Sequence, residues 1–256
     1  MTRRALLVLA AVAAGVALVG CGGDDESADT TDTVTTTEPA ETTDLRVYWL
    51  RDGKVWPTAR EVEETQAVAE AALEELLGGP TSVEASDLQV TTAIPEGTNI
   101  EAVTIDDGVA SVELSAELPE EPLAQVVYTV TQFPTVDSVE IEGDSYTRAD
   151  FEDLTPAILV ESPLSFEEVD NPLRATGTAN TFEANFQYTL TDTDGLIVDE
   201  NFVTATSGSG ERGTFDFTTA EYEIPFDGVG ALIVFELSAE DGSRINLVEI
   251  PVRMSR

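Results

Sequence analysis

The chain has 256 residues, and its 50 acidic and 12 basic side chains give a formal net charge of −38 at pH 7. Because binding to nucleic acids or anionic lipid surfaces needs clustered Lys and Arg, this charge argues against both as direct partners. Histidine is absent and Cys21 is the sole cysteine, which excludes His-based catalytic triads, His-ligated metals and intramolecular disulfides. Hydrophobic residues make up 42% of the chain, enough for two ordinary folded domains.

Residues 1–20 have the features of a secretory signal peptide. Arg3 and Arg4 form a short positive region, and 15 uncharged, mostly apolar residues run from Ala5 to Val19, fewer than the roughly 20 of a membrane-spanning helix. The sequence LVGC at 18–21 then resembles the bacterial lipobox. The resemblance implies diacylglycerol on the sulfur of Cys21, cleavage before this residue, and an extracytoplasmic protein that is lipid-anchored to the cell membrane. The alternative is a transmembrane anchor with an incidental cysteine.

Residues 21–44 are predicted to form a disordered acidic tether. The segment is rich in Gly, Asp, Glu and Thr and has almost no apolar residue, so it cannot bury enough surface to order itself. The Thr cluster at 30–37 is open to two interpretations, a bare spacer or a site of O-linked sugars. We favour the spacer.

Residues 45–153 are predicted to form a small α+β domain with the element order β-α-β-β-β-α-β. Asp52-Gly53 and Asp107-Gly108 are expected turns, and Gly78-Gly79-Pro80 is expected to end the first helix. The second helix is ambiguous because Val, Tyr and Thr favour strand, but prolines bracket it. The predicted strands are 45–50, 88–94, 100–105, 109–114 and 136–142, and the predicted helices are 60–77 and 122–133.

Residues 157–256 are predicted to form an all-β domain after a linker at 146–156. Alternating apolar residues and the hairpin turns at Asp194-Gly195 and Asp241-Gly242 indicate successive antiparallel strands. Seven short strands in about 100 residues indicate an immunoglobulin-like sandwich without the disulfide. The predicted strands are 157–161, 173–179, 184–192, 196–206, 212–219, 231–239 and 244–252.

The first domain resembles the GerMN domain, named for the N-terminal region of a sporulation and germination lipoprotein. The matching blocks are VYWL (47–50), AALEELLGGP (71–80), IPEGTNIEAVTIDDGVASVELS (94–115) and QVVYTVTQFPTVDSVEIEGD (125–144). The second domain resembles the immunoglobulin-like domain associated with spore germination, through ILVESP (158–163), NPLRATGTANTFEANFQYTL (171–190), GTFDF (213–217) and VFELSAEDGS (234–243). The resemblance implies an envelope lipoprotein whose GerMN domain is folded like the ring-building modules of secretion assemblies, and it implies no enzyme.

Several acidic and aromatic residues are candidates for metal-binding, sugar-binding or catalytic sites. Asp192, Asp194 and Gly195 form part of a calcium-loop pattern, but the remaining spacing is missing and a hairpin turn is the simpler interpretation. Tyr48, Trp49 and Trp56 are expected either to stack on a sugar or to pack in the core, and core packing is favoured. The acidic pairs 63–64, 74–75 and 120–121 are expected to be solvated rather than catalytic. The Gly-rich segment 207–213 lacks the lysine of a phosphate-binding loop. We therefore expect no catalytic, cofactor-binding or metal-binding residue.

The sequence thus favours a non-catalytic, membrane-anchored envelope lipoprotein that binds a protein partner, in an envelope complex or one of the sporulation or germination type. The expected partner surface is a sheet edge of the second domain, because unpaired edges invite strand addition. The main alternative is a cell-wall or carbohydrate-binding surface module. A hydrolase that uses paired carboxylates is the third hypothesis.

Overall fold

The computed structural model describes residues 41–256, and the chain from Ala40 onward forms one compact unit. Cys21, the predicted signal peptide and most of the predicted tether lie outside this range. Within residues 41–256, no helix is both long and apolar enough to cross a membrane.

A long antiparallel hairpin begins the described chain. Strands β1 (Thr42–Arg51) and β2 (Lys54–Glu63) pair along their whole length, with Trp49 opposite Trp56. The predicted turn at Asp52-Gly53 is confirmed, and both residues have positive φ. Two predictions are wrong here. Residues 42–44 belong to β1 and not to a disordered tether, and residues 60–63 belong to β2 and not to a helix. Pairing with β1 in regular register outweighs the local helical pattern of residues 60–67.

Helix α1 (Val68–Gly78) buries Ala69, Ala72, Leu73 and Leu76 on one side, and it ends as predicted because Gly79 takes a positive φ of 79°. A single π-helical turn, η1 (Glu84–Leu88), follows. The predicted strand 88–94 is wrong, since Thr91 alone makes an isolated bridge, to Leu50. The backbone N–H of Ala93 instead donates to the side chain of Gln125 at 2.8 Å, which takes the place of a strand partner.

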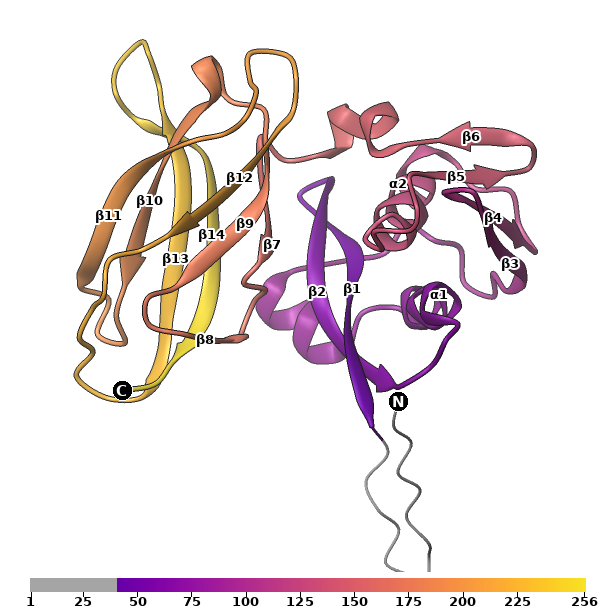
Figure 1. Cartoon of the computed structure of the whole chain (residues 1–256), viewed down its shortest axis with the longest axis horizontal. Helices are drawn as coiled ribbons and strands as arrows, with labels where there is room; N and C mark the ends of the chain where they lie inside the picture. Colours follow the sequence, from indigo (N-terminus) through magenta and orange to yellow (C-terminus); the bar gives the residue numbers. More distant parts are fainter. Residues whose placement is uncertain (1–40) are drawn as a thin grey trace, which may run out of the picture. The chain divides into compact units, whose positions relative to one another are not determined.

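A four-stranded sheet in the order β3-β4-β5-β6 completes the α+β part (Figure 1). Strands β3 (Ile100–Asp106) and β4 (Val109–Leu114) form the predicted hairpin around Asp107-Gly108. Helix α2 (Glu120–Val130) is the crossover to the parallel strand β5 (Ser138–Ile141), so the helix prediction at 122–133 is confirmed with shifted bounds. Strand β6 (Asp144–Tyr146) was not predicted. The predicted linker contains a 3-10 helix, η2 (Arg148–Leu154).

The rest of the chain is a sandwich of two sheets, which confirms the predicted immunoglobulin-like fold (Figure 1). The strand pairs are antiparallel except that the short β8 is parallel to β14. One sheet has the order β11-β10-β13-β14-β8 and the other the order β12-β9-β7. A short 3-10 turn, η3 (Phe182–Ala184), precedes β10, and β8 was not predicted. The strands are β7 (Ile158–Ser162), β8 (Glu168–Val169), β9 (Arg174–Ala179), β10 (Asn185–Thr191), β11 (Ile197–Thr204), β12 (Gly213–Thr218), β13 (Gly228–Leu237) and β14 (Arg244–Met254).

Aromatic side chains fill the space between the two sheets. Phe186 and Tyr188 point inward from β10, and Phe215 and Phe217 come from β12. The rings of Phe186 and Phe215 meet edge to face at 4.9 Å, and those of Tyr188 and Phe217 stack at 4.5 Å. Gly177 lets β9 pass close to β7, because a Cβ there would meet the carbonyl oxygen of Leu159 at 2.0 Å.

Candidate functional site

The carboxyl of Glu161 on β7 lies at the centre of a largely buried polar cluster. The hydroxyl of Tyr48 donates to this carboxyl, and Arg148 Nη1 lies 2.8 Å from Glu161 Oε1. Arg148 also lies over the ring of Tyr128, 4.7 Å from its centroid. Burial acts to raise the pKa of Glu161, but the charge of Arg148 and the two hydrogen bonds outweigh it and hold the pKa below its ordinary value. Because every group here is internally paired, this cluster fixes structure and offers no free acid or base.

A second ion pair ties η2 to the residues before β12. Arg212 donates from Nε and Nη2 to the two carboxylate oxygens of Glu152, at 2.8 and 2.9 Å, and also reaches the carbonyl of Pro156. These donations lower the pKa of Glu152, against the effect of burial. This bidentate pair again has no spare hydrogen-bonding capacity directed at a ligand.

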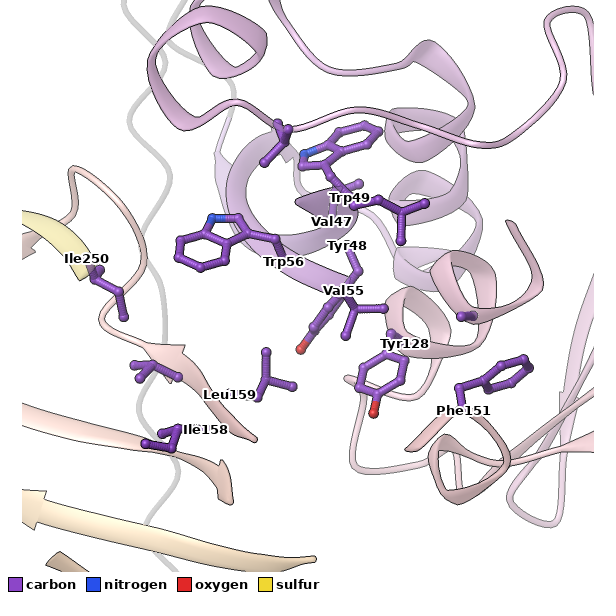
Figure 2. Packing of buried hydrophobic residues seen from close by; sticks show 14 of the residues in the cluster. Val47, Tyr48, Trp49, Val55, Trp56, Tyr128, Phe151, Ile158, Leu159 and Ile250 are labelled. Atoms are coloured by element: carbon purple, nitrogen blue, oxygen red, sulfur yellow. The ribbon is translucent and has the colours of Figure 1, made fainter. Parts of the chain in front are cut away.

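The aromatic residues singled out in the sequence lie in the core. Tyr48 and Trp49 are fully buried and Trp56 is 8% exposed, with the indole N–H of Trp49 donating to Thr58 at 2.8 Å. Figure 2 shows Tyr48, Val55 and Trp56 among the buried side chains that also include Leu159 and Ile250. The sugar-stacking interpretation of these aromatic residues is therefore wrong, and the favoured core-packing interpretation is confirmed.

The acidic candidates are surface or turn residues. Asp192 Oδ1 accepts from the backbone N–H groups of Asp194 and Leu196 at 2.9 and 2.8 Å, so its carboxylate stabilises the β10–β11 turn. The carboxyls at 63–64, 74–75 and 120–121 are exposed or half-buried, and Glu75 pairs with Arg60. No group of three or more metal-ligating side chains occurs in the part of the chain that the structure covers. Nothing there has the facing, partly apolar carboxylates of a glycosidase.

Exposed apolar side chains are concentrated in the sandwich. Of eleven large hydrophobic residues that are exposed within residues 41–256, Val83 and Ile105 alone belong to the α+β part. The other nine are Phe182, Leu196, Ile197, Phe202, Phe226, Val229, Leu237, Ile245 and Leu247. A single scattered hydrophobic residue needs no explanation, but a contiguous group marks an interaction surface.

Strand β13 makes this group contiguous. Leu232 and Val234 point into the sandwich and are fully buried, so the alternate residues of β13 point outward. Those outward positions are all apolar: Val229, Ala231, Ile233, Phe235 and Leu237. A sheet with one solvated face normally alternates apolar and polar residues. The uninterrupted apolar run at 229–235 of β13 is the sequence signal for this surface, although the pattern was expected to indicate only a strand.

Neighbouring strands extend the surface on both sides of β13. On the same face, Phe202 of β11 is opposite Gln187, which is in turn opposite Phe235. Pro251 of β14 lies opposite Ala231. Phe202 is 71% exposed, Leu247 50% and Val229 49%, whereas Phe235 is 3% exposed and lies under the guanidinium of Arg244. We call this group of seven residues the outer apolar face: Val229, Ala231, Ile233, Phe235, Phe202, Leu247 and Pro251.

The size of the outer apolar face fits an interface. Four neighbouring strands about 4.8 Å apart, followed for about eight residues, cover on the order of 500 Å². A partner of matching size would bring the total buried area to about 1,000 Å², which is the lower range of specific interfaces. The seven residues of the face lie on β11, β13 and β14, and β10 runs between β11 and β13 (Figure 1).

Comparison with known families assigns both parts of the chain. A family model described as sporulation and spore germination matches residues 46–147, and one described as the immunoglobulin-like domain of bacterial spore germination matches residues 157–243. These matches confirm the predicted resemblance of both domains, and neither description names an enzymatic activity. No curated protein matches the chain.

Three solved structures are similar to parts of the chain. The tandem GerMN domains of the sporulation protein GerM from Bacillus subtilis are 23% identical over 43% of this chain, with a TM-score of 0.35, and this chain spans 42% of that structure. The first GerMN domain of the same protein is 25% identical over 41% of this chain and 86% of its own length, with a TM-score of 0.30. A candidate lipoprotein from Clostridium perfringens is 18% identical over 44% of this chain and 93% of its own, with a TM-score of 0.30.

Proposed function

Because the chain carries a sporulation and spore germination domain and the immunoglobulin-like domain of bacterial spore germination, we propose that it is a non-catalytic envelope lipoprotein that binds a protein partner. The acyl chains on Cys21 hold it at the membrane. Its part in a complex of the sporulation or germination type is to present a docking surface.

The observation that carries this proposal is the outer apolar face. Burying apolar surface is favourable by about 25 cal/mol per Å², so the exposed side chains of Phe202, Val229 and Leu247 favour association with a partner that covers them. Of the outward residues of β13, Val229 and Leu237 are 49% and 47% exposed, and Ala231 and Ile233 are half-buried. The predicted sheet-edge surface is thereby replaced by a sheet face, with the edge strand β11 contributing Phe202 at its border.

The tether sets where the partner lies. From Cys21 to Thr42 the chain spans about 21 residues, and a chain of this length reaches at most about 75 Å. The partner is therefore an envelope protein within that distance of the membrane surface.

The burial of Tyr48 and Trp49 removes the observation behind the carbohydrate-binding alternative. The large exposed aromatic residues in the described chain are Phe182, Phe202 and Phe226, and Phe202 alone of these belongs to the outer apolar face. A protein surface is the better match for a broad, flat apolar patch.

Crosslinking in intact cells tests the proposal. Lys54 is the sole lysine of the chain, so the full-length protein is coupled through its many carboxylates to lysines of its neighbours and the products are identified by mass spectrometry. We expect a discrete envelope protein that is lost in a Phe202→Asn variant and kept in the control Thr214→Asn on the other sheet. Recovery of the same products from both variants would contradict the proposal.

A further inference from the structure

One row of side chains across the outer apolar face carries charge. The register places Glu200 of β11 beside Thr189 of β10, Thr189 beside Ile233 of β13, and Ile233 beside Glu249 of β14. Since paired residues share a face, all four side chains lie on the outside of the sheet. Two carboxylates thus flank an apolar centre, and three strand spacings separate them by about 14 Å.

Neither carboxylate is neutralised within the described chain. The five ion pairs among residues 41–256 include neither Glu200 nor Glu249. Arg244 is on the same face, but its guanidinium lies over the ring of Phe235, 4.0 Å from the centroid. Arg253 is opposite Val229, four residues along β14 from Glu249, or about 14 Å away. Within the described residues, the row from Glu200 to Glu249 therefore presents two unpaired carboxylates on either side of Thr189 and Ile233.

A buried hydroxyl in the same row lacks a partner. Thr189 is 2% exposed, and its Oγ1 has no hydrogen-bond partner in the part of the chain that the structure covers. Because this hydroxyl is already covered by the chain itself, Thr189 separates the two carboxylates as an uncharged, buried position.

The charge of this row distinguishes three possible partners for the outer apolar face: segment 22–44 of this chain, a second copy of the chain, and a cationic protein. The segment 22–44 of this chain has eight acidic residues, no basic residue and almost no apolar residue, so it matches neither the charge nor the apolar surface. A second copy also carries a net charge of −38, and two-fold pairing about Ile233 would set the Glu200–Glu249 row against itself. A cationic protein surface satisfies both the local row and the overall field of the chain.

We propose that the outer apolar face docks a basic protein whose contact surface has an apolar side chain over Ile233 and Lys or Arg groups placed to pair with Glu200 and Glu249. This inference rests on the proposed function and adds the chemistry of the partner to it. The acidic chain draws the basic partner in at long range, and the apolar stripe of β13 supplies the short-range attraction.

The test uses the full-length chain in its host membrane, with a photo-crosslinking amino acid at position 229. The adduct yield is compared between the otherwise unaltered chain, a Glu200→Lys/Glu249→Lys variant and a control, Glu101→Lys/Glu140→Lys. The control pair changes the net charge equally, and both its residues are exposed on the four-stranded sheet. We expect the outer-face variant to lose the adduct about tenfold and the control less than about twofold, because two exposed ion pairs become repulsions.

The crosslinked peptide must also be basic. Support requires that the adduct maps to a partner segment with Lys or Arg flanking apolar residues and that Glu200→Gln and Glu249→Gln each lower the yield by a smaller factor. Equal losses in both charge-reversed variants, no loss in either, or an adduct with a second copy of this chain would overturn the inference. If Phe202→Asn abolishes the adduct while Glu200→Lys/Glu249→Lys keeps it, the docking surface stands and the basic partner is wrong. An unaltered chain that gives no adduct contradicts both proposals.

Discussion

Replacing Arg148 with methionine tests the energetic importance of the buried cluster around Glu161. Methionine keeps much of the apolar stem that packs beside Tyr128 but removes the charge that lies 2.8 Å from the Glu161 carboxylate. Removing one partner of a buried ion pair typically costs about 3–5 kcal/mol, because the other charge stays buried. Arg46 remains near, donating to the backbone carbonyl of Glu161 at 3.1 Å. We therefore expect a cost at or just below the lower end of this range, about 2–3 kcal/mol.

The assay is urea unfolding of residues 41–256, followed by the fluorescence of the two tryptophans. At about 2–4 °C per kcal/mol for a unit of this size, the melting temperature should also fall by about 4–12 °C. Arg174→Met is the matched control, because Arg174 and its partner Asp216 are both more than half exposed. This control should leave the unfolding midpoint unchanged.

The stability difference between the unaltered chain and the Arg148→Met variant should depend on pH. The pKa of Glu161 is below its ordinary value, so the carboxylate stabilises the native chain above about pH 4.3 and loses this contribution as the pH falls through the folded pKa. Without Arg148, burial dominates and the pKa of Glu161 rises, so the variant regains stability on acidification. The difference between the two proteins should be full at pH 7 and shrink toward pH 4. A difference below about 1 kcal/mol at pH 7, or one independent of pH, would refute this reasoning.

Three further results are expected. Hydrogen bonds, chiefly from Arg60, lower the pKa of Glu84 to about 2 despite its burial, so Glu84→Gln should cost about 1–3 kcal/mol at pH 7 and almost nothing near pH 2 in urea titrations. Gly177→Ala should prevent stable folding of the sandwich, whereas Gly78→Ala, with open space around its Cβ, should be neutral or stabilising; equal melting temperatures for the two would be the contrary result. Cys21→Ser should leave the protein unprocessed or released on cell fractionation, and normal membrane retention would disprove lipidation.

The sandwich could be predicted almost strand by strand because its signals are local. Asp-Gly turns and alternating residues such as Phe186, Tyr188 and Leu190 carry both the boundaries and the inward face. The hairpin of β1 and β2 could not be predicted in full, because residues 60–67 fit a helical pattern until pairing with β1 is known. The same limit applies to residues 88–94, whose backbone partner is the side chain of Gln125 on α2.

The candidate surface was present in the sequence but was not recognised. Residues 229–235 of β13 (VGALIVF) are apolar on both faces, which is expected of a strand buried on both sides. A sandwich buries only one side of each sheet. An apolar outer side on β13 therefore indicates a surface that a partner covers. By contrast, the contacts of Glu161 with Tyr48 and Arg148 join residues 113 and 13 positions apart, and no sequence pattern predicts them.

The most direct test of the central claim is a photo-crosslinking amino acid placed at position 202 of the full-length chain in living cells, with position 214 as the control. Binding through the outer apolar face predicts one discrete envelope protein attached at 202 and none at 214. No protein adduct at 202, or the same adduct at both positions, would contradict it.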